Sequence, residues 1–277
     1  MKLYSTTRTD SLVARVIGRI LMLCVCLGLL TTTGCITTVS MDEKPIVTES
    51  RAKRDLGIDY LSTGRTAMAI RELMASVQLD PKDPMTHLWL GEAYRRKGKN
   101  DLAEDYLKEA IALSADPEHI RSLHAAQLTL SALLGQIGRY EESIEYCKSM
   151  AVDPTVSTPW RPLTNCGWAQ MKLNRLNEAR ASFEDALDYF PGYGPALLNL
   201  GILEAKEGHR LAAIKTFERA LDRFSTGGRA EVNYRLGELY VAMGQRDRAV
   251  GHFSEAVLIA PLLDWGSQSQ AYLDLLR

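Results

Sequence analysis

A pattern that recurs every 34 residues constrains this chain more than any other feature of its sequence. Its clearest copy is the stretch 236–261, which reads LGELYVAMGQRDRAVGHFSEAVLIAP. Leu236 and Tyr240 lie four residues apart and share one helix face, and Gly244 can take the positive φ found where helices end. Small and large side chains then alternate along a second segment, which Pro261 ends. The stretch predicts two short antiparallel helices joined by a glycine turn.

The same spacing continues through most of the chain. Gly57 and Gly91 are one period apart, and the leucine, tyrosine and alanine positions around them agree. The pattern resembles the tetratricopeptide repeat (TPR) family, whose unit is a 34-residue helical hairpin. The resemblance implies an all-α fold, a right-handed superhelical TPR solenoid of about six hairpins plus a C-terminal capping helix. The expected repeats lie within 50–261, at about 50–83, 84–117, 124–157, 160–193, 194–227 and 230–263, and the capping helix at 264–277.

Three places depart from the regular repeat. The segment 114–123 carries about six extra residues, including Pro117, and predicts a longer connection or an extended helix. The third repeat is the weakest, because Ser131 stands at its glycine position. The turn of the fourth repeat has Asn174, a residue type that also tolerates the left-handed conformation.

The first 34 residues differ in kind from the repeats. Basic residues precede a short apolar run, 20–30, which small residues connect to Cys35. This is the layout of a secretory signal. As a helix the run would extend about 16 Å, roughly half of the ~30 Å hydrocarbon core of a bilayer. A cleaved signal over 1–34 is therefore favoured over a spanning helix.

The end of this signal resembles the lipobox of bacterial lipoproteins, in which a cysteine is lipidated, with palmitate among its acyl chains, and becomes the mature N-terminus. The resemblance implies lipidation of Cys35 and stable membrane anchoring. The family usually has leucine where this chain has Thr32, and the alternative is an ordinary signal with a chance cysteine. Ile36 replaces the aspartate that commonly signals inner-membrane retention, which favours the periplasmic side of a Gram-negative outer membrane. Residues 35–49 lack helical periodicity and predict a flexible tether.

Little in the sequence points to catalysis or to a cofactor. The five histidines have no metal-ligand spacing, and the glycines recur at repeat turns rather than in a phosphate-binding motif. A net charge of −1 and a pI near 6.5 argue against a broad nucleic-acid footprint. We expect a protein that is not an enzyme, with no cofactor, no metal, no nucleic-acid partner and no small-molecule substrate.

Two cysteines remain in the repeats. Cys147 falls on the second helix of the third repeat and Cys166 on the first helix of the fourth, and these helices are neighbours in a TPR stack. In an oxidising periplasm the two can form a disulfide if their Cα atoms lie within ~7 Å. The alternative is a pair of separate buried thiols.

Protein binding is the function that remains. In TPR proteins the first helix of each hairpin lines a concave groove, and an apolar strip rimmed by arginine indicates a site for a peptide or a helix. The alternative is that several of these side chains form the core between repeats. By the family pattern, the groove positions are Arg54, Ile58, Leu61, Met85, Leu88 and Arg95 in the opening repeats, and Trp168, Met171, Leu198, Ile202 and Tyr234 in later ones.

A lipoprotein signal, a short tether and six TPRs together resemble the pilotin family of type IV pilus biogenesis. The resemblance implies a role in the outer-membrane assembly and localisation of the pilus secretin, on which surface pili and twitching or gliding motility depend. The expected partner is a secretin subunit or another periplasmic or outer-membrane protein. Two alternatives remain open: a general outer-membrane scaffold for β-barrel assembly or the peptidoglycan machinery, and an accessory subunit of an enzyme.

Overall fold

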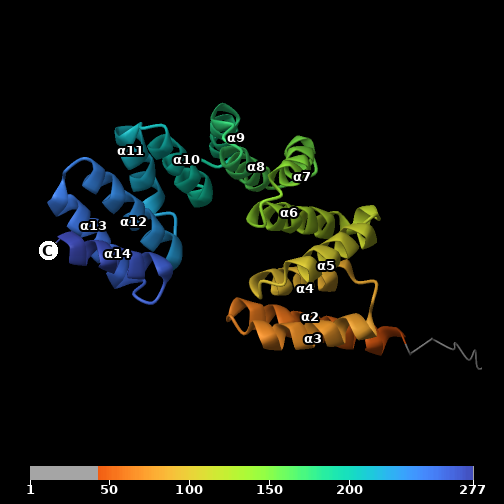
Figure 1. Ribbon diagram of the computed structural model, residues 1–277. Helices are drawn as coiled ribbons and strands as arrows, with labels where there is room; N and C mark the ends of the chain where they lie inside the picture. The colour runs from red at the N-terminus through yellow and green to blue at the C-terminus, as the bar shows by residue number, and fades with distance from the viewer. Residues whose placement is uncertain (1–42, 277) are drawn as a thin grey trace, which may run out of the picture. The chain divides into compact units, whose positions relative to one another are not determined.

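The computed structural model describes residues 43–276, and within them every regular element is helical (Figure 1). The predicted signal, Cys35 and the first part of the predicted tether lie outside the described residues. Six hairpins follow one another and a thirteenth α-helix closes the stack: α2 (Glu43–Ser62) with α3 (Thr66–Leu79), α4 (Pro84–Arg96) with α5 (Asn100–Leu113), α6 (Ile120–Gln136) with α7 (Tyr140–Val152), α8 (Trp160–Lys172) with α9 (Leu176–Tyr189), α10 (Gly194–Lys206) with α11 (Arg210–Leu221), α12 (Thr226–Ala242) with α13 (Arg246–Ile259), and α14 (Asp264–Leu276). The all-α solenoid expected from the repeats is confirmed.

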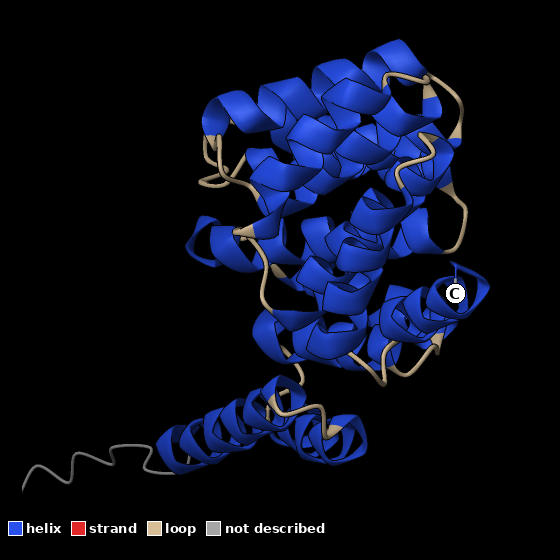
Figure 2. Ribbon diagram, turned by 90° about the vertical axis from the view of Figure 1, so that its left-hand side faces the viewer, coloured by secondary structure: helices blue, strands red, loops and turns tan. Residues whose placement is uncertain are grey.

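The helices form two layers. The first helices of successive hairpins, α4, α6, α8, α10 and α12, each contact the next one, and α12 contacts α14 in the same way. The second helices α5, α7, α9 and α11 each pack between their own partner and the first helix of the following hairpin, and α13 packs between α12 and α14. Short loops join the helices throughout (Figure 2). Within residues 43–276 no helix is both long enough and apolar enough to cross a bilayer.

A left-handed residue stands in the turn of every hairpin. The turn residues with positive φ are Gly64, Gly98, Gly138, Gly208 and Gly244, at 72° to 86°, and Asn174, at 60°. In the last hairpin this conformation lets the N–H of Gln245 donate to the carbonyl of Tyr240 at 2.9 Å, which closes the end of α12. The turns predicted at Gly244 and Asn174 are therefore confirmed, and asparagine serves where glycine is missing.

The first helix begins earlier than the sequence suggests. α2 starts at Glu43, so the predicted tether 35–49 is wrong for its last seven residues. Pro45 falls in the first turn, where a helix leaves its N–H groups unpaired and proline is tolerated. Ser50 is buried, and its hydroxyl lies 3.0 Å from that of Ser76 on α3. This polar contact holds the start of α2 against its partner helix.

The extra residues before the third repeat form both a longer connection and an extended helix, the two alternatives predicted for this segment. A short 3₁₀ turn, Pro117–His119, connects the two hairpins, and α6 then runs for 17 residues, longer than the 13 of α4. Asp116 begins the turn, because its carboxylate accepts a hydrogen bond from the N–H of Glu118 at 3.1 Å. The insertion thus lengthens one helix and leaves the packing order unchanged.

Each repeat glycine makes room for a large side chain of the partner helix. A Cβ on Gly237 would lie 2.5 Å from the Phe253 ring, and Gly201 has the same relation to Phe217. Both rings are fully buried. The spacing of glycine and phenylalanine in the sequence therefore encodes the close approach of the two helices in a hairpin.

The third repeat solves the same packing problem with different residues. Ser131, which replaces the glycine, is buried, and its hydroxyl lies 3.3 Å from that of Ser143 on α7. The position that holds leucine or phenylalanine in other repeats has the smaller Cys147, also fully buried. A smaller side chain on α7 thus offsets the larger one on α6.

Cys147 is joined to Cys166 of α8 by a disulfide, with their Cα atoms 5.6 Å apart. Of the two alternatives left by the sequence, the structure has the bridge. It links the third hairpin to the fourth. The third repeat is the one whose core lacks the large side chain found in the other repeats.

We expect that replacing Cys147 and Cys166 together by alanine lowers the free energy of unfolding by about 3 kcal/mol. A bridge with a sequence separation of 19 restricts the unfolded chain by roughly this amount. The measurement is urea unfolding followed by circular dichroism, with and without dithiothreitol. The parent should lose stability on reduction and the double variant should not respond. Equal midpoints for all four samples would contradict a stabilising bridge.

Candidate functional site

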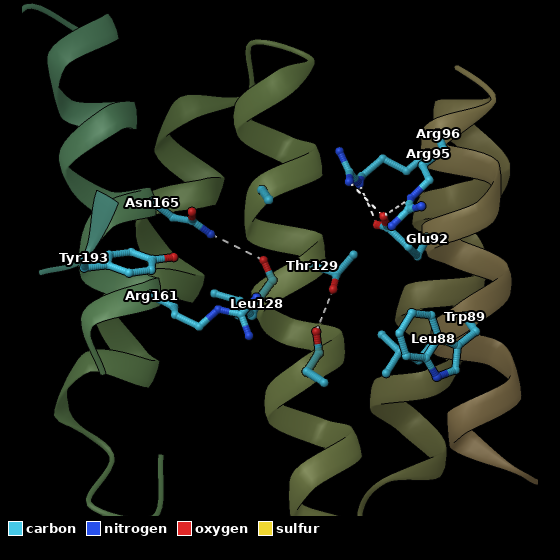
Figure 3. A pocket seen from close by; sticks show the side chains of 12 residues that line it. Leu88, Trp89, Glu92, Arg95, Arg96, Leu128, Thr129, Arg161, Asn165 and Tyr193 are labelled. Atoms are coloured by element: carbon cyan, nitrogen blue, oxygen red, sulfur yellow. Dashed lines mark hydrogen bonds and ion pairs between the residues drawn. The ribbon is translucent and has the colours of Figure 1, made fainter. Parts of the chain in front are cut away.

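Two adjoining cavities lie along the first helices of the second to fifth hairpins. The larger has a volume of about 470 Å³ and is lined mainly by α4, α6 and α8 (Figure 3). The second, of about 390 Å³, is lined mainly by α6, α8 and α10. They share Ala132, Asn165 and Tyr193, so together they form one continuous depression, which we call the central groove.

The residues that line the central groove lie on one face of each of these helices, in successive turns. The larger cavity is lined by Leu88, Trp89, Glu92, Arg95, Arg96, Ala125, Leu128, Thr129, Ala132, Arg161, Asn165 and Tyr193. The second is lined by Ser131, Ala132, Gly135, Gln136, Ser143, Thr164, Asn165, Trp168, Tyr193, Pro195 and Asn199. Apolar, amide and guanidinium groups are mixed along the surface, which suits recognition of a polypeptide.

Glu92 is the single carboxylate of the groove lining, and two arginines hold it. The Nε and Nη2 atoms of Arg95 donate to its two oxygens at 2.8 and 3.0 Å, and Arg96 Nε donates at 2.6 Å. Burial of the Glu92 carboxyl opposes its ionisation, but these hydrogen bonds outweigh that effect, so its pKa lies below the usual value. Arg95 also donates to Gln136 on α6 at 3.0 Å and thereby ties α4 to α6 across the groove.

Tyr193, which belongs to an aromatic cluster, lines the other side of the groove. Tyr193 precedes α10 and packs against Phe190, with ring centroids 6.0 Å apart. Phe190 in turn meets the edge of Trp160, at the start of α8, at 5.5 Å. Figure 3 shows Tyr193 across from Leu88 and Trp89, with Arg161 and Leu128 between them. In the larger cavity, Trp89 and the Glu92–arginine cluster of α4 therefore face Tyr193 on the opposite side.

Three of the predicted groove residues line the groove: Arg95, Trp168 and Leu88. Leu88 is only 5% exposed and also belongs to the core between the second and third hairpins. Five more are half-buried and line neither cavity: Arg54, Ile58, Met85, Leu198 and Ile202. Arg54 has a structural contact instead, an ion pair of 2.9 Å with Asp83 at the start of α4. Leu198 and Ile202 pack against the core of the last two hairpins.

The prediction is wrong for Leu61, Met171 and Tyr234, which belong to the core. They are only 2%, 6% and 6% exposed. Leu61 packs with Leu73 and Leu90 between the first two hairpins. Tyr234 is covered by α14, whose Trp265 ring lies 5.2 Å away. A first helix has neighbours on both sides in its layer, so less of its surface faces the groove than the family pattern suggests.

Sequence reasoning missed most of the polar groove residues, although a signal for four of them exists. Trp89, Thr129, Asn165 and Asn199 all stand two residues before the repeat glycine position. Asn165 and Asn199 are also one 34-residue period apart. Arg161 has no such repeated counterpart in residue type, because the equivalent position holds Ala125 or Pro195 in the adjoining repeats.

The described residues show no arrangement typical of a metal centre. Within 43–276, no group of three or more histidine, cysteine, aspartate or glutamate side chains is placed to hold a metal ion. What the groove offers is a surface of exposed donors and aromatic rings, which can bind another molecule by contact.

Comparison with known proteins shows which family and which proteins this chain resembles. The family model for the tetratricopeptide repeat matches residues 54–118, 167–228 and 198–262, together more than half of the chain. Among curated proteins, the chain is 26% identical over 202 residues to the type IV pilus assembly protein PilF of Pseudomonas aeruginosa, which covers 71% of this chain and 75% of PilF. It is 28% identical over 190 residues to tetratricopeptide repeat protein 16 of Macaca fascicularis, covering 66% of this chain but only 21% of that much longer protein.

Solved structures share the fold. The crystal structure of PilW, a type IV pilus biogenesis factor, superposes with a TM-score of 0.66 at 21% identity, over 81% of this chain and 98% of PilW. The structure of Pseudomonas aeruginosa PilF gives 0.62 at 19% identity, over 82% of this chain and 99% of PilF. The repeats, the hairpin stack and the matching family model agree, and the chain belongs to the tetratricopeptide repeat family.

Proposed function

We propose that this chain is a protein-binding component of type IV pilus biogenesis. The observation that carries the proposal is the similarity to PilF, which extends over about three quarters of both chains rather than over a few shared repeats. The repeat solenoid supplies rigid helices, and the central groove supplies a surface on which a partner segment can lie. Repeat proteins bind through such extended surfaces.

In its specific form, the proposal is that the protein promotes outer-membrane assembly and localisation of the pilus secretin. A lipid anchor at Cys35 would hold the repeats on the periplasmic side of the outer membrane, and the central groove would hold a secretin subunit while the pore assembles. This form rests on the lipobox-like sequence, the six hairpins and the similarity to PilF.

The experiment is an in-frame deletion in the source bacterium, complemented with the parent gene. We expect the deletion strain to keep secretin as monomers on denaturing gels and to lose surface pili, and complementation to restore heat-stable multimers. If the deletion strain keeps multimers and pili at the parental level, the pilus proposal fails. A general outer-membrane scaffold then becomes the better account.

Anchoring gives a separate prediction. Cys35→Ala should release the mature protein from the membrane fraction and remove its acyl label, because no other anchor is proposed. The matched control is Cys26→Ala, the same substitution inside the signal, which should leave both the label and the sedimentation unchanged. Outer-membrane sedimentation of Cys35→Ala with its label intact would contradict lipidation at this residue.

A further inference from the structure

We propose that the central groove takes an acidic, extended segment of the partner, and that Arg161 is the cation that selects it. The inference rests on the proposed function only in that the chain binds a protein. It adds the chemistry of the bound segment and the residue that determines specificity. The charge of the groove, its unused hydrogen-bond donors and the spacing of two amide side chains support it.

The charge of the groove is unbalanced. Its lining has three guanidinium groups, and Glu92 is its one carboxylate. Arg95 and Arg96 both bind Glu92, which leaves no acidic side chain of the groove for Arg161. In the part of the chain that the structure describes, the Arg161 guanidinium has no ion pair and no hydrogen bond, and its side chain is exposed. Because the whole chain is slightly acidic, this excess of positive charge is local.

A carboxylate of a ligand fits this position better than any other common group of a polypeptide. A guanidinium offers two parallel donors that match the two oxygens of a carboxylate. Arg161 lines the larger cavity from α8 and extends toward Leu128, on the side of the cavity where Tyr193 lies (Figure 3). The apolar and aromatic surroundings would reduce solvent screening of such a pair compared with a fully exposed one.

Other donors of the groove are also unused. The indole Nε1 of Trp89 is buried without a hydrogen-bond partner. The amide of Asn165 makes one long contact, 3.4 Å to the carbonyl of Leu128. Within residues 43–276, the side chains of Asn199 and Tyr193 have no hydrogen-bond partner. Trp89 and Arg161 can only donate, whereas the amides and the tyrosine hydroxyl can donate or accept, so the groups without partners favour a ligand that brings oxygen atoms.

The two asparagines favour an extended segment. Asn165 on α8 and Asn199 on α10 stand at the same repeat position of adjacent hairpins, and their helices are in contact. The axes of packed helices lie about 8–10 Å apart. Three residues of a polyproline-II segment span about 9 Å. Each asparagine can therefore meet the main chain of the same segment, three residues apart, because an amide both donates and accepts.

The test uses the purified full chain and three labelled decapeptides, rich in glutamate, glutamine or lysine, followed by fluorescence anisotropy. We expect the glutamate peptide to bind most tightly and its affinity to fall as salt is added. Arg161→Gln should weaken this binding at least about tenfold, the loss of one charge-assisted contact, and Arg161→Lys should restore part of it. The control is Arg219→Gln, an exposed arginine on α11 outside the groove, which should bind like the parent.

Several results would overturn the inference. One is equal affinity of the parent and Arg161→Gln for the glutamate peptide. Another is a glutamine or lysine peptide that binds as tightly as the glutamate peptide, or no binding of the glutamate peptide at millimolar concentration. A single-stranded oligonucleotide that binds more tightly than the glutamate peptide would assign the groove to nucleic acid instead.

A cellular experiment separates this inference from the proposed function. If deletion of the gene abolishes secretin multimers but an Arg161→Glu strain keeps them, the function stands and the acidic-segment inference fails. If deletion leaves multimers unchanged while peptide binding in vitro still depends on Arg161, the inference stands and the pilus function fails. Loss of multimers in both strains, with Arg161→Glu protein present at the parental level, supports both.

Discussion

Gly237→Trp is expected to destabilise the last hairpin severely, by more than about 4 kcal/mol. A Cβ at this position would already lie 2.5 Å from the Cε1 atom of Phe253, closer than carbon atoms approach in proteins. The Phe253 ring is fully buried and stacks on Tyr272 of α14, with centroids 4.7 Å apart, so it has no free space into which to move. An indole could enter only if α12 and α13 separate.

The control for this variant lies in the same hairpin. A Cβ added to Gly251 on α13 would meet no neighbouring side chain within 4 Å, and Gly251 is exposed, so Gly251→Trp should leave stability nearly unchanged. Thermal unfolding gives the comparison, and hydrogen exchange should show α12, α13 and α14 losing protection in Gly237→Trp. A melting temperature within a degree or two of the parent would show that Gly237 is not at a close helix contact.

Leu61→Glu is expected to lower the free energy of unfolding by about 4 kcal/mol or more. Truncation of a buried leucine alone costs about 2–5 kcal/mol, and the new carboxylate would have to be buried without a partner or become protonated. Leu61 is 2% exposed and packs against Leu73 and Leu90. A loss of partner binding in this variant would therefore report unfolding of the first hairpins rather than a groove contact.

The same substitution on an exposed leucine of the same helix provides the control. Leu56 is 41% exposed, so Leu56→Glu should change the urea midpoint little. If Leu61→Glu unfolds at the same urea concentration as Leu56→Glu, then Leu61 is not part of the core and its assignment to the groove regains support.

Leu56 also shows where a repeat pattern stops predicting burial. Its counterparts in later repeats, Leu90, Leu130 and Leu236, are fully buried, because each packs against the preceding hairpin. Leu56 belongs to the first hairpin of the described residues and has no preceding hairpin there. The spacing identifies the position, but burial depends on a neighbour that this hairpin lacks among residues 43–276.

The local rules of the hairpin were determined by the sequence alone. Glycine or Asn174 at each turn, a glycine opposite a large side chain in five of the six repeats and proline after most second helices act within about 34 residues, so each can be recognised without knowledge of the rest of the chain. For the same reason the sequence indicated where the regular pattern is interrupted, by a different residue type at Ser131 and by extra residues around Pro117. It left the pairing of Cys147 with Cys166 open, because that contact joins two different hairpins.

The division between core and groove was decided only by the tertiary structure. From α4 onward, each first helix packs against its own partner and against the elements before and after its hairpin, so the part of its surface that remains free depends on side chains outside its own repeat. Tyr234 is buried because α14 covers it, whereas Arg161 is exposed and has no acidic partner in the groove, because Glu92, the carboxylate of the groove, is already bound by Arg95 and Arg96. Repeat spacing specifies where a side chain lies on its helix, but its solvent exposure and its partners depend on the neighbouring helices.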